Sequence, residues 1–181
     1  MNDLSVPETA TMHAGFVMAH AALVASMLEP GKLICPFAVI AKGDSRQSIE
    51  FEAETQDQAV DQAWSSLNDY RDHIDLWAMA REGLIANRDG KDDVLVVATW
   101  THGMPEAVVF IQRFRPAVQG FALVGPVMVQ SELGSDQLSL IKKWFYQGIT
   151  QHPKGSNWQS WLDAARQGSQ LEGPTPGGLA D

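Results

Sequence analysis

The sequence predicts a single α+β domain built on one antiparallel sheet of about six strands, with helices packed on the sheet. Its length of 181 residues fits one domain. Hydrophobic residues make up 45% of the chain and charged residues 19%, which provides enough apolar surface for a core. Four apolar stretches in the second half follow one another across short turns, and strands joined by hairpin turns pair antiparallel.

The first half of the chain predicts a helix, a hairpin and a second helix. Residues 9–28 carry no formal charge and include many small side chains, which is typical of a buried helix that ends before Pro30. Alternating apolar and polar residues then predict a hairpin with one solvated face. Thr55 caps the second helix. The predicted ranges are a helix to residue 28, strands at 33–41 and 48–53, and a helix from residue 55.

The second half predicts four consecutive strands followed by two helices. The turns contain Asp89-Gly90, Gly103 and Gly120. The second and third of these strands are almost continuously apolar, so we expect them at the centre of the sheet and covered on both faces. Gly148 is expected to end the longer helix. The predicted ranges are strands at 74–86, 94–101, 107–115 and 121–129, a helix at 135–147 and a short helix from residue 156.

The resulting order, α-ββ-α-ββββ-α-α, resembles that of profilin-like and roadblock/longin-type domains, with one extra strand. The resemblance is one of element order alone and no sequence motif accompanies it. It therefore implies a fold and no function. We assign residues 1–167 to the domain. Residues 168–181 are rich in glycine and proline, a composition typical of a flexible tail.

Charge and cysteine content exclude several classes of protein. Lys and Arg number 13 against 22 Asp and Glu, a net charge of −9, whereas nucleic-acid binding needs clustered basic side chains. The single cysteine, Cys35, excludes an internal disulfide and favours a reducing, cytoplasmic location. No basic residue precedes the uncharged stretch 9–28, as a secretory signal requires. The histidines and hydroxyls of this stretch argue against a membrane span.

The sequence carries no motif for catalysis or for a cofactor. It contains no G-x-S-x-G elbow, phosphate-binding glycine loop or H-E-x-x-H motif. Cys35 lies in an apolar run, which raises the pKa of a thiol and keeps it unreactive. His13 and His20 are two helical turns apart, too far to chelate one metal ion. We therefore predict a non-catalytic role with no cofactor and no metal site.

Acidic residues are concentrated in one part of the chain. Residues 44–93 contain 13 acidic and 5 basic side chains, a net charge of −8. We interpret this as a face that binds a basic protein partner, because complementary charge speeds association, and an inhibitor of the immunity or antitoxin type is one version. The alternative is a solvated surface that only keeps the chain soluble. The candidate partner-binding residues are Glu50, Glu52, Glu54, Asp57 and Asp61.

A second interpretation is a small-molecule-binding protein or an enzyme without a recognisable motif. Its candidate ligand-binding residues are Arg81, His102, Arg113 and Arg115, expected to meet at one end of the sheet. Arg113 and Arg115 alternate along one strand, so their guanidinium groups share a face and could hold a carboxylate or phosphate. The competing interpretation is structural: the strand arginines pair with acidic neighbours, and Arg81 forms a buried ion pair with Glu82.

A third interpretation is a homodimer joined through the first helix. Small residues recur along this helix and permit close approach by another element. That element is either a part of the same chain or the first helix of a second copy. The small residues are Ala14, Gly15, Ala19, Ala21, Ala22 and Ala25.

Overall fold

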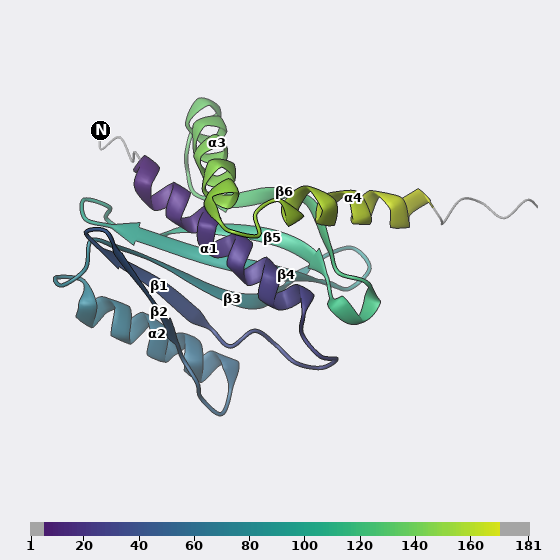
Figure 1. Ribbon diagram of the computed structural model, residues 1–181, viewed down its shortest axis with the longest axis horizontal. Coiled ribbons are helices and arrows are strands. Elements are labelled where there is room, and N and C mark those ends of the chain that lie inside the picture. Colours follow the sequence, from purple (N-terminus) through teal and green to yellow (C-terminus); the bar gives the residue numbers. More distant parts are fainter. Residues whose placement is uncertain (1–5, 171–181) are drawn as a thin grey trace, which may run out of the picture.

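Four α-helices and one six-stranded antiparallel sheet make up the described part of the chain, which is residues 6–170 of the computed structural model, with side chains to residue 167 (Figure 1). The helices are α1 (Glu8–Ser26), α2 (Gln56–Tyr70), α3 (Ser135–Gln151) and α4 (Asn157–Gln170). The strands are β1 (Phe37–Lys42), β2 (Ser45–Glu50), β3 (Leu76–Ala86), β4 (Lys91–Thr101), β5 (Val108–Arg115) and β6 (Ala122–Gln130). The sheet has the order β2-β1-β3-β4-β5-β6, and the predicted fold class is confirmed.

The sheet is a hairpin joined to a four-stranded meander. The hairpin turns at Gly43, whose φ of 55° favours glycine, between the paired residues Lys42 and Ser45. The chain then passes through α2 and returns beside β1, so β3 pairs with β1 and leaves β2 at the edge. From β3 to β6 each strand pairs with the next one in the chain, as the hairpin-type turns predict.

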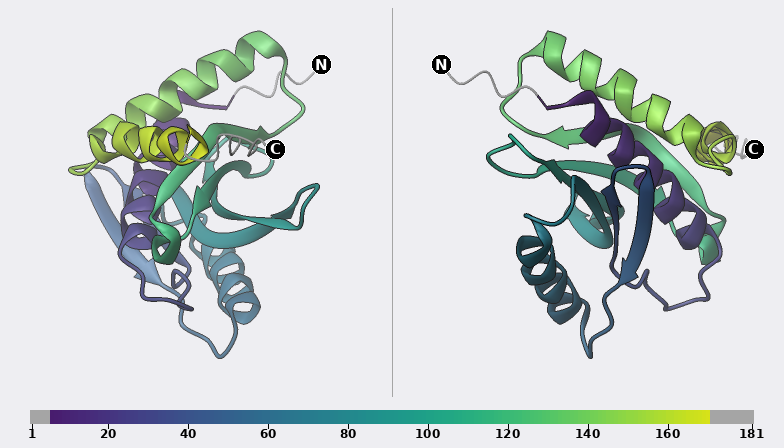
Figure 2. Two further views of the ribbon diagram at one scale, coloured as in Figure 1. Left: turned by 90° about the vertical axis from the view of Figure 1, so that its right-hand side faces the viewer. Right: turned by 60° about the vertical axis from the view of Figure 1, so that its left-hand side comes forward.

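Three helices cover one face of the sheet, which we call the α1 face. α1 crosses β3 and β4, α3 lies over β5 with Phe145 stacked on Phe110 at 4.7 Å between ring centroids, and α4 packs on β6. Figure 2 shows these helices on one side of the sheet and α2 on the other. The main core lies between the sheet and these helices and continues under α2, where it includes Ala63, Leu67 and Trp77.

The contact between α1 and α3 depends on two glycines. A Cβ atom on Gly15 of α1 would overlap the carbonyl oxygen of Phe145, and one on Gly148 of α3 would overlap the carbonyl oxygen of Met12. The prediction that Gly148 ends the helix is therefore wrong. Gly148 lies inside α3, which continues to Gln151. The face of α1 on which a homodimer was expected is buried against α3 and the sheet of the same chain.

Two buried polar side chains fix α1 to the sheet. The hydroxyl of Thr99 on β4 lies 3.1 Å from the carbonyl oxygen of Ala10 and 3.0 Å from that of Trp77, and its proton is shared between them. His13 places Nε2 at 2.8 Å from the carbonyl oxygen of Val39, to which it donates.

None of the helices within residues 6–170 is long and apolar enough to cross a membrane.

We expect Thr99→Val to lower the free energy of unfolding by about 1–3 kcal/mol, because two buried carbonyl groups lose their shared donor while the shape of the side chain is kept. Chemical denaturation measures the change. The matched control is Thr101→Val, since the Thr101 hydroxyl donates to the backbone carbonyl oxygen of Asp75 at the surface and its loss costs less. Equal losses in the two variants would contradict the role given to Thr99.

The opposite face of the sheet, which we call the α2 face, is covered by α2 along β3 alone. Trp64 of α2 packs edge-on against Trp77 at 5.4 Å between ring centroids, and Gln56 donates to the carbonyl oxygen of Glu82 at 3.2 Å. Beyond β3 this face carries a small apolar cluster, separate from the main core, that includes Val96 and Ile111. No helix packs on β4 and β5 here, but Val94 is 1% exposed and Val96 and Ile111 are each 7% exposed, so the side chains of these strands are buried on this face, as predicted, without a covering helix.

Proline explains the largest differences at the strand ends. Pro36 has no N–H, and β1 begins after it at Phe37 instead of at residue 33. β2 ends at Glu50 instead of at residue 53, because Phe51 still donates its amide hydrogen to the carbonyl oxygen of Pro36 at 2.8 Å but Pro36 has no N–H to donate in return. At the other end of the chain α4 continues to Gln170, beyond the predicted domain boundary. The rest of the predicted tail, residues 171–181, lies outside the described residues.

Candidate functional site

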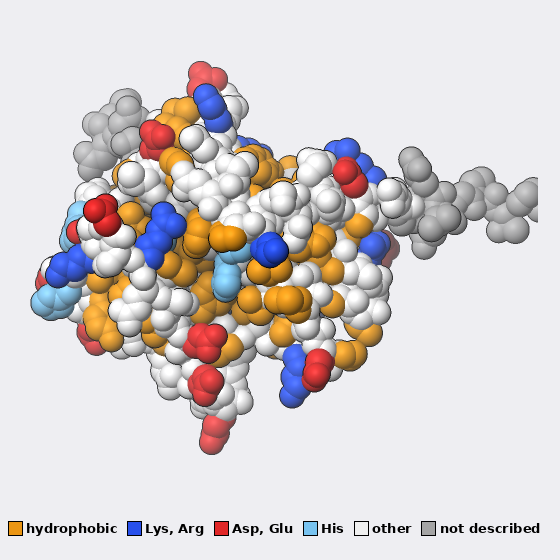
Figure 3. Space-filling view, viewed as in Figure 1, with side chains coloured by type: hydrophobic (Ala, Val, Ile, Leu, Met, Phe, Trp, Pro, Cys, Tyr) orange, Lys and Arg blue, Asp and Glu red, His pale blue; other side chains and the backbone are white. Residues whose placement is uncertain are grey.

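The five acidic residues predicted to bind a partner are close together in the sequence and exposed. Glu50 ends β2, Glu52 and Glu54 follow in the connection, and Asp57 and Asp61 lie one turn apart on α2. No ion pair joins any of them to another described residue. Figure 3 shows acidic side chains at the lower end of the molecule, where the connection between β2 and α2 lies. We call these five residues the acidic surface.

The carboxylates of the acidic surface act on the only cysteine. Burial raises the pKa of the Cys35 thiol, and the negative charges of Glu50 and Glu52 raise it further. The sulfur atom lies 3.5 Å from the carbonyl oxygen of Phe51, to which the thiol donates. The thiol is therefore protonated at neutral pH and is a poor nucleophile.

The four residues of the small-molecule interpretation do not meet at one end of the sheet. His102 follows the end of β4 and has Nε2 at 2.8 Å from the carbonyl oxygen of Ile74. Arg113 lies opposite Val94, near the start of β4, so it is at the other end. Arg115 is held locally, with Nε donating to the carbonyl oxygen of Gly120 at 2.6 Å. Arg81 and Arg113 share the α2 face, because the strand register places them on the same side of β3 and β5.

Of Arg81 and Arg113, one is paired with a carboxylate and one is not. Arg113 forms an ion pair with Asp92 at 3.5 Å, as the structural interpretation expects. Arg81 has no ion-pair partner among the described residues, and its Nη1 donates only to the carbonyl oxygen of Glu82 at 3.2 Å. The predicted Arg81–Glu82 ion pair is wrong, because successive residues of a strand point to opposite faces. The Glu82 carboxylate instead accepts the amide hydrogen of Ile34 at 2.9 Å.

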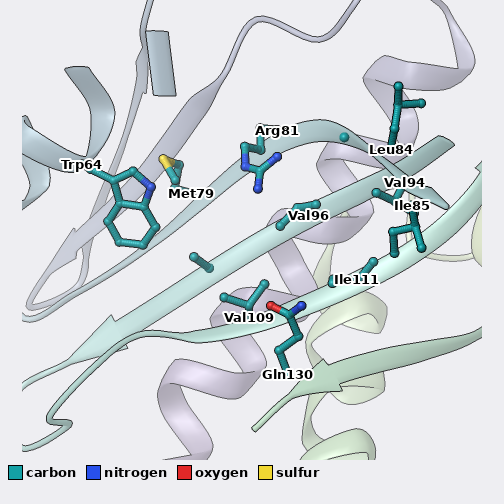
Figure 4. Close-up of a pocket in the computed structure, with 12 residues that line it drawn as sticks. Trp64, Met79, Arg81, Leu84, Ile85, Val94, Val96, Val109, Ile111 and Gln130 are labelled. Carbon is teal, nitrogen blue, oxygen red and sulfur yellow. The ribbon is translucent and has the colours of Figure 1, made fainter. Parts of the chain in front are cut away.

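A cavity of about 250 Å³ lies on the α2 face, between α2 and the strands. Figure 4 shows Trp64 at one end of this cavity and Ile85 at the other, with Arg81 between them. Apart from Arg81 and Gln130, the cavity is lined by apolar residues and a glycine. A more open cavity of about 610 Å³ adjoins it, shares Arg81 as a wall, and is bordered by Asp57 and Asp61 of the acidic surface. We call the smaller of the two the Arg81 cavity.

A third cavity, of about 240 Å³, lies on the α1 face at the end of α1. Glu82 and Asp93 contribute carboxylates to its lining. Burial raises the pKa of Glu82, the Asp93 charge raises it further, and the hydrogen bond from Ile34 opposes both effects. Within residues 6–170, no three histidine, cysteine or carboxylate side chains gather in a way that could hold a metal ion.

Sequence reasoning missed the Arg81 cavity, although one signal for it was present. The period-2 pattern of a strand separates Arg81 from Glu82 and places Arg81 on the same side as Met79 and Ile85. That pattern predicts a cation among apolar side chains. The position of α2, which packs along β3 and leaves β4 and β5 without a helix on this face, is a tertiary feature that no local pattern reports.

Comparison of the chain with known protein families, with curated proteins and with solved structures gave no match. Its function is therefore inferred from the arrangement of its own side chains.

Proposed function

We propose that this protein is a non-catalytic protein-binding module whose acidic surface binds a basic protein partner. The observation that supports the proposal is the run of five exposed carboxylates between Glu50 and Asp61, none of which has a cation partner among the described residues. These exposed carboxylates carry the same charge, and lysine or arginine side chains of a partner would pair with them. Their field reaches about 8 Å into solution at physiological ionic strength, which assists encounter.

The open cavity beside the acidic surface adds a feature that partner-binding surfaces share. Asp57 and Asp61 border the more open cavity, and Leu84, which is 60% exposed, lies in its lining. Protein interfaces combine an apolar centre with a polar rim, and an apolar group beside carboxylates fits that pattern. An inhibitor of the immunity or antitoxin type and a cytoplasmic location remain predictions within this proposal.

Capture of partners from an extract of the source cells at low salt tests the proposal. The proteins compared are wild type, the triple variant Glu50→Lys, Glu52→Lys and Asp57→Lys, and a control triple variant with equal change of charge. The control changes Asp89, Glu106 and Glu132 to lysine, three exposed residues outside the acidic surface. We expect wild type and control to retain one basic partner and the first variant to lose it. We also expect about 0.5 M salt to release the partner, because screening shortens the reach of the charges.

Two outcomes would contradict the proposal. Retention of the same partner by the Glu50, Glu52 and Asp57 variant would show that these carboxylates do not bind it. Equal loss with the control variant would show an effect of net charge rather than of this surface. Circular dichroism of the three proteins confirms that each is folded before the comparison.

A further inference from the structure

We propose that the Arg81 cavity binds a small molecule that has a carboxylate at one end and an apolar chain at the other, with Arg81 as the anion-binding residue. This site is separate from the protein-binding role proposed for the acidic surface. Three observations carry it: an arginine without an ion-pair partner, an apolar cavity beside it, and the absence of a covering helix over the β4 and β5 part of this face.

The guanidinium of Arg81 has unused binding capacity. It carries five N–H donors in a planar fork, of which only Nη1 has a hydrogen-bond partner among the described residues, the carbonyl oxygen of Glu82. Arg113 on the same face is already paired with Asp92. A carboxylate matches the geometry of a free guanidinium and forms two parallel hydrogen bonds with it. Arg81 is therefore the position in this cavity where a ligand anion would bind.

The wall beyond Arg81 selects an apolar chain. Val96 lies directly opposite Arg81 on β4, and Ile111 lies opposite Val96 on β5. Val96 and Ile111 belong to the separate apolar cluster of the α2 face. Neighbouring strands are about 4.8 Å apart, so a chain that crosses from β3 to β5 covers about 10 Å. An unbranched chain of medium length, such as that of decanoate, spans this distance and buries its own apolar surface against these side chains, which are themselves already buried.

The carboxylates near the site would favour a ligand of opposite charge to the one proposed. Asp57 and Asp61 border the adjoining open cavity and would attract a cationic head group instead. Both are exposed, so water and salt screen their charges more strongly than that of the half-buried Arg81. Three compounds with the same chain separate these effects: decanoate has an anionic head, decanol a neutral one and decylammonium a cationic one.

Isothermal titration calorimetry of the full chain with the three compounds tests the proposal. We expect decanoate to bind about tenfold or more tightly than decanol, and decylammonium to bind more weakly than decanoate. Arg81→Gln should reduce the affinity for decanoate to that for decanol and leave the affinity for decanol unchanged. Arg81→Lys should keep part of the preference, because it keeps the charge and loses the fork. Arg88→Gln, in an exposed turn, is the matched control and should bind as wild type does.

Methyl chemical shifts locate the bound chain. Decanoate should shift the methyl signals of Val94, Val96 and Ile111, which line the cavity, and leave those of Val17 in the main core unchanged. The proposal is overturned if decanoate does not bind, if decanol or decylammonium binds as tightly, or if Arg81→Gln binds decanoate as wild type does. It is also overturned if the shifts lie outside the cavity.

Discussion

Replacing Gly15 by alanine is expected to lower the free energy of unfolding by about 3 kcal/mol or more, which for a chain of this size can abolish folding at physiological temperature. The added methyl group would overlap the carbonyl oxygen of Phe145, and this obstacle is backbone rather than a movable side chain. α1 and α3 must therefore separate, and the core between α1, α3 and the sheet opens with them. Gly148→Ala meets the carbonyl oxygen of Met12 and should have an effect of similar size.

Denaturant unfolding followed by circular dichroism measures these losses. The matched control is Gly134→Ala, because a Cβ atom on Gly134 meets nothing within 4 Å and the residue lies at the start of α3. We expect the control to change stability by less than a third as much. A loss for Gly15→Ala no larger than for Gly134→Ala would show that the two helices do not approach as closely as described.

Acidification is expected to destabilise the protein through His13. Burial, the largest cause, lowers the pKa of His13 to about 4, and the charge of Arg46 lowers it further against the opposing hydrogen bond to Val39. The unfolded chain binds a proton near the ordinary pKa of about 6.5, whereas the folded chain does not until the pH is near 4. The free energy of unfolding is therefore unaffected by His13 above about pH 6.5. It falls by about 3 kcal/mol as the pH drops from there to about 4.

Unfolding free energies of wild type and His13→Gln between pH 7.5 and pH 4 isolate this contribution. Glutamine keeps a donor and does not titrate, so the variant should lose less stability than wild type as the pH falls. His20 and His152, whose pKa values burial also lowers, act on both proteins alike. His73→Gln, at an exposed position, is the control and should follow wild type. Parallel curves for wild type and His13→Gln would refute the assignment.

The fold follows from local patterns to a large extent. Thr55 accepts the amide hydrogen of Gln58 at 3.2 Å, as its cap position predicts. The first hairpin turns between Lys42 and Ser45, at the glycine that the sequence places there. The position of Gly148 inside α3, in contrast, does not follow from a local pattern. A glycine near the end of a helix has two explanations, a helix end or a close contact, and only the partner backbone of Met12 decides between them.

The candidate sites were predictable to different degrees. The acidic surface is continuous in the sequence between Glu50 and Asp61, so composition alone located it. His102 and Arg113 were expected to meet, and they do not, because meeting depends on strand register and direction. Arg81 was expected to pair with Glu82, although the alternation of a strand separates them. Local charge is thus visible in a sequence, while the cavity beside Arg81 depends on where α2 packs.

The affinity of the captured partner for wild type and for the Glu50, Glu52 and Asp57 variant, measured at low and at high salt, tests the proposed role of the acidic surface most directly. We expect the triple variant to bind at least about a hundredfold more weakly at low salt, because three attractive contacts become repulsive. The difference should shrink at high salt. Equal affinities of the two proteins at low salt would contradict the proposal that the acidic surface binds the partner.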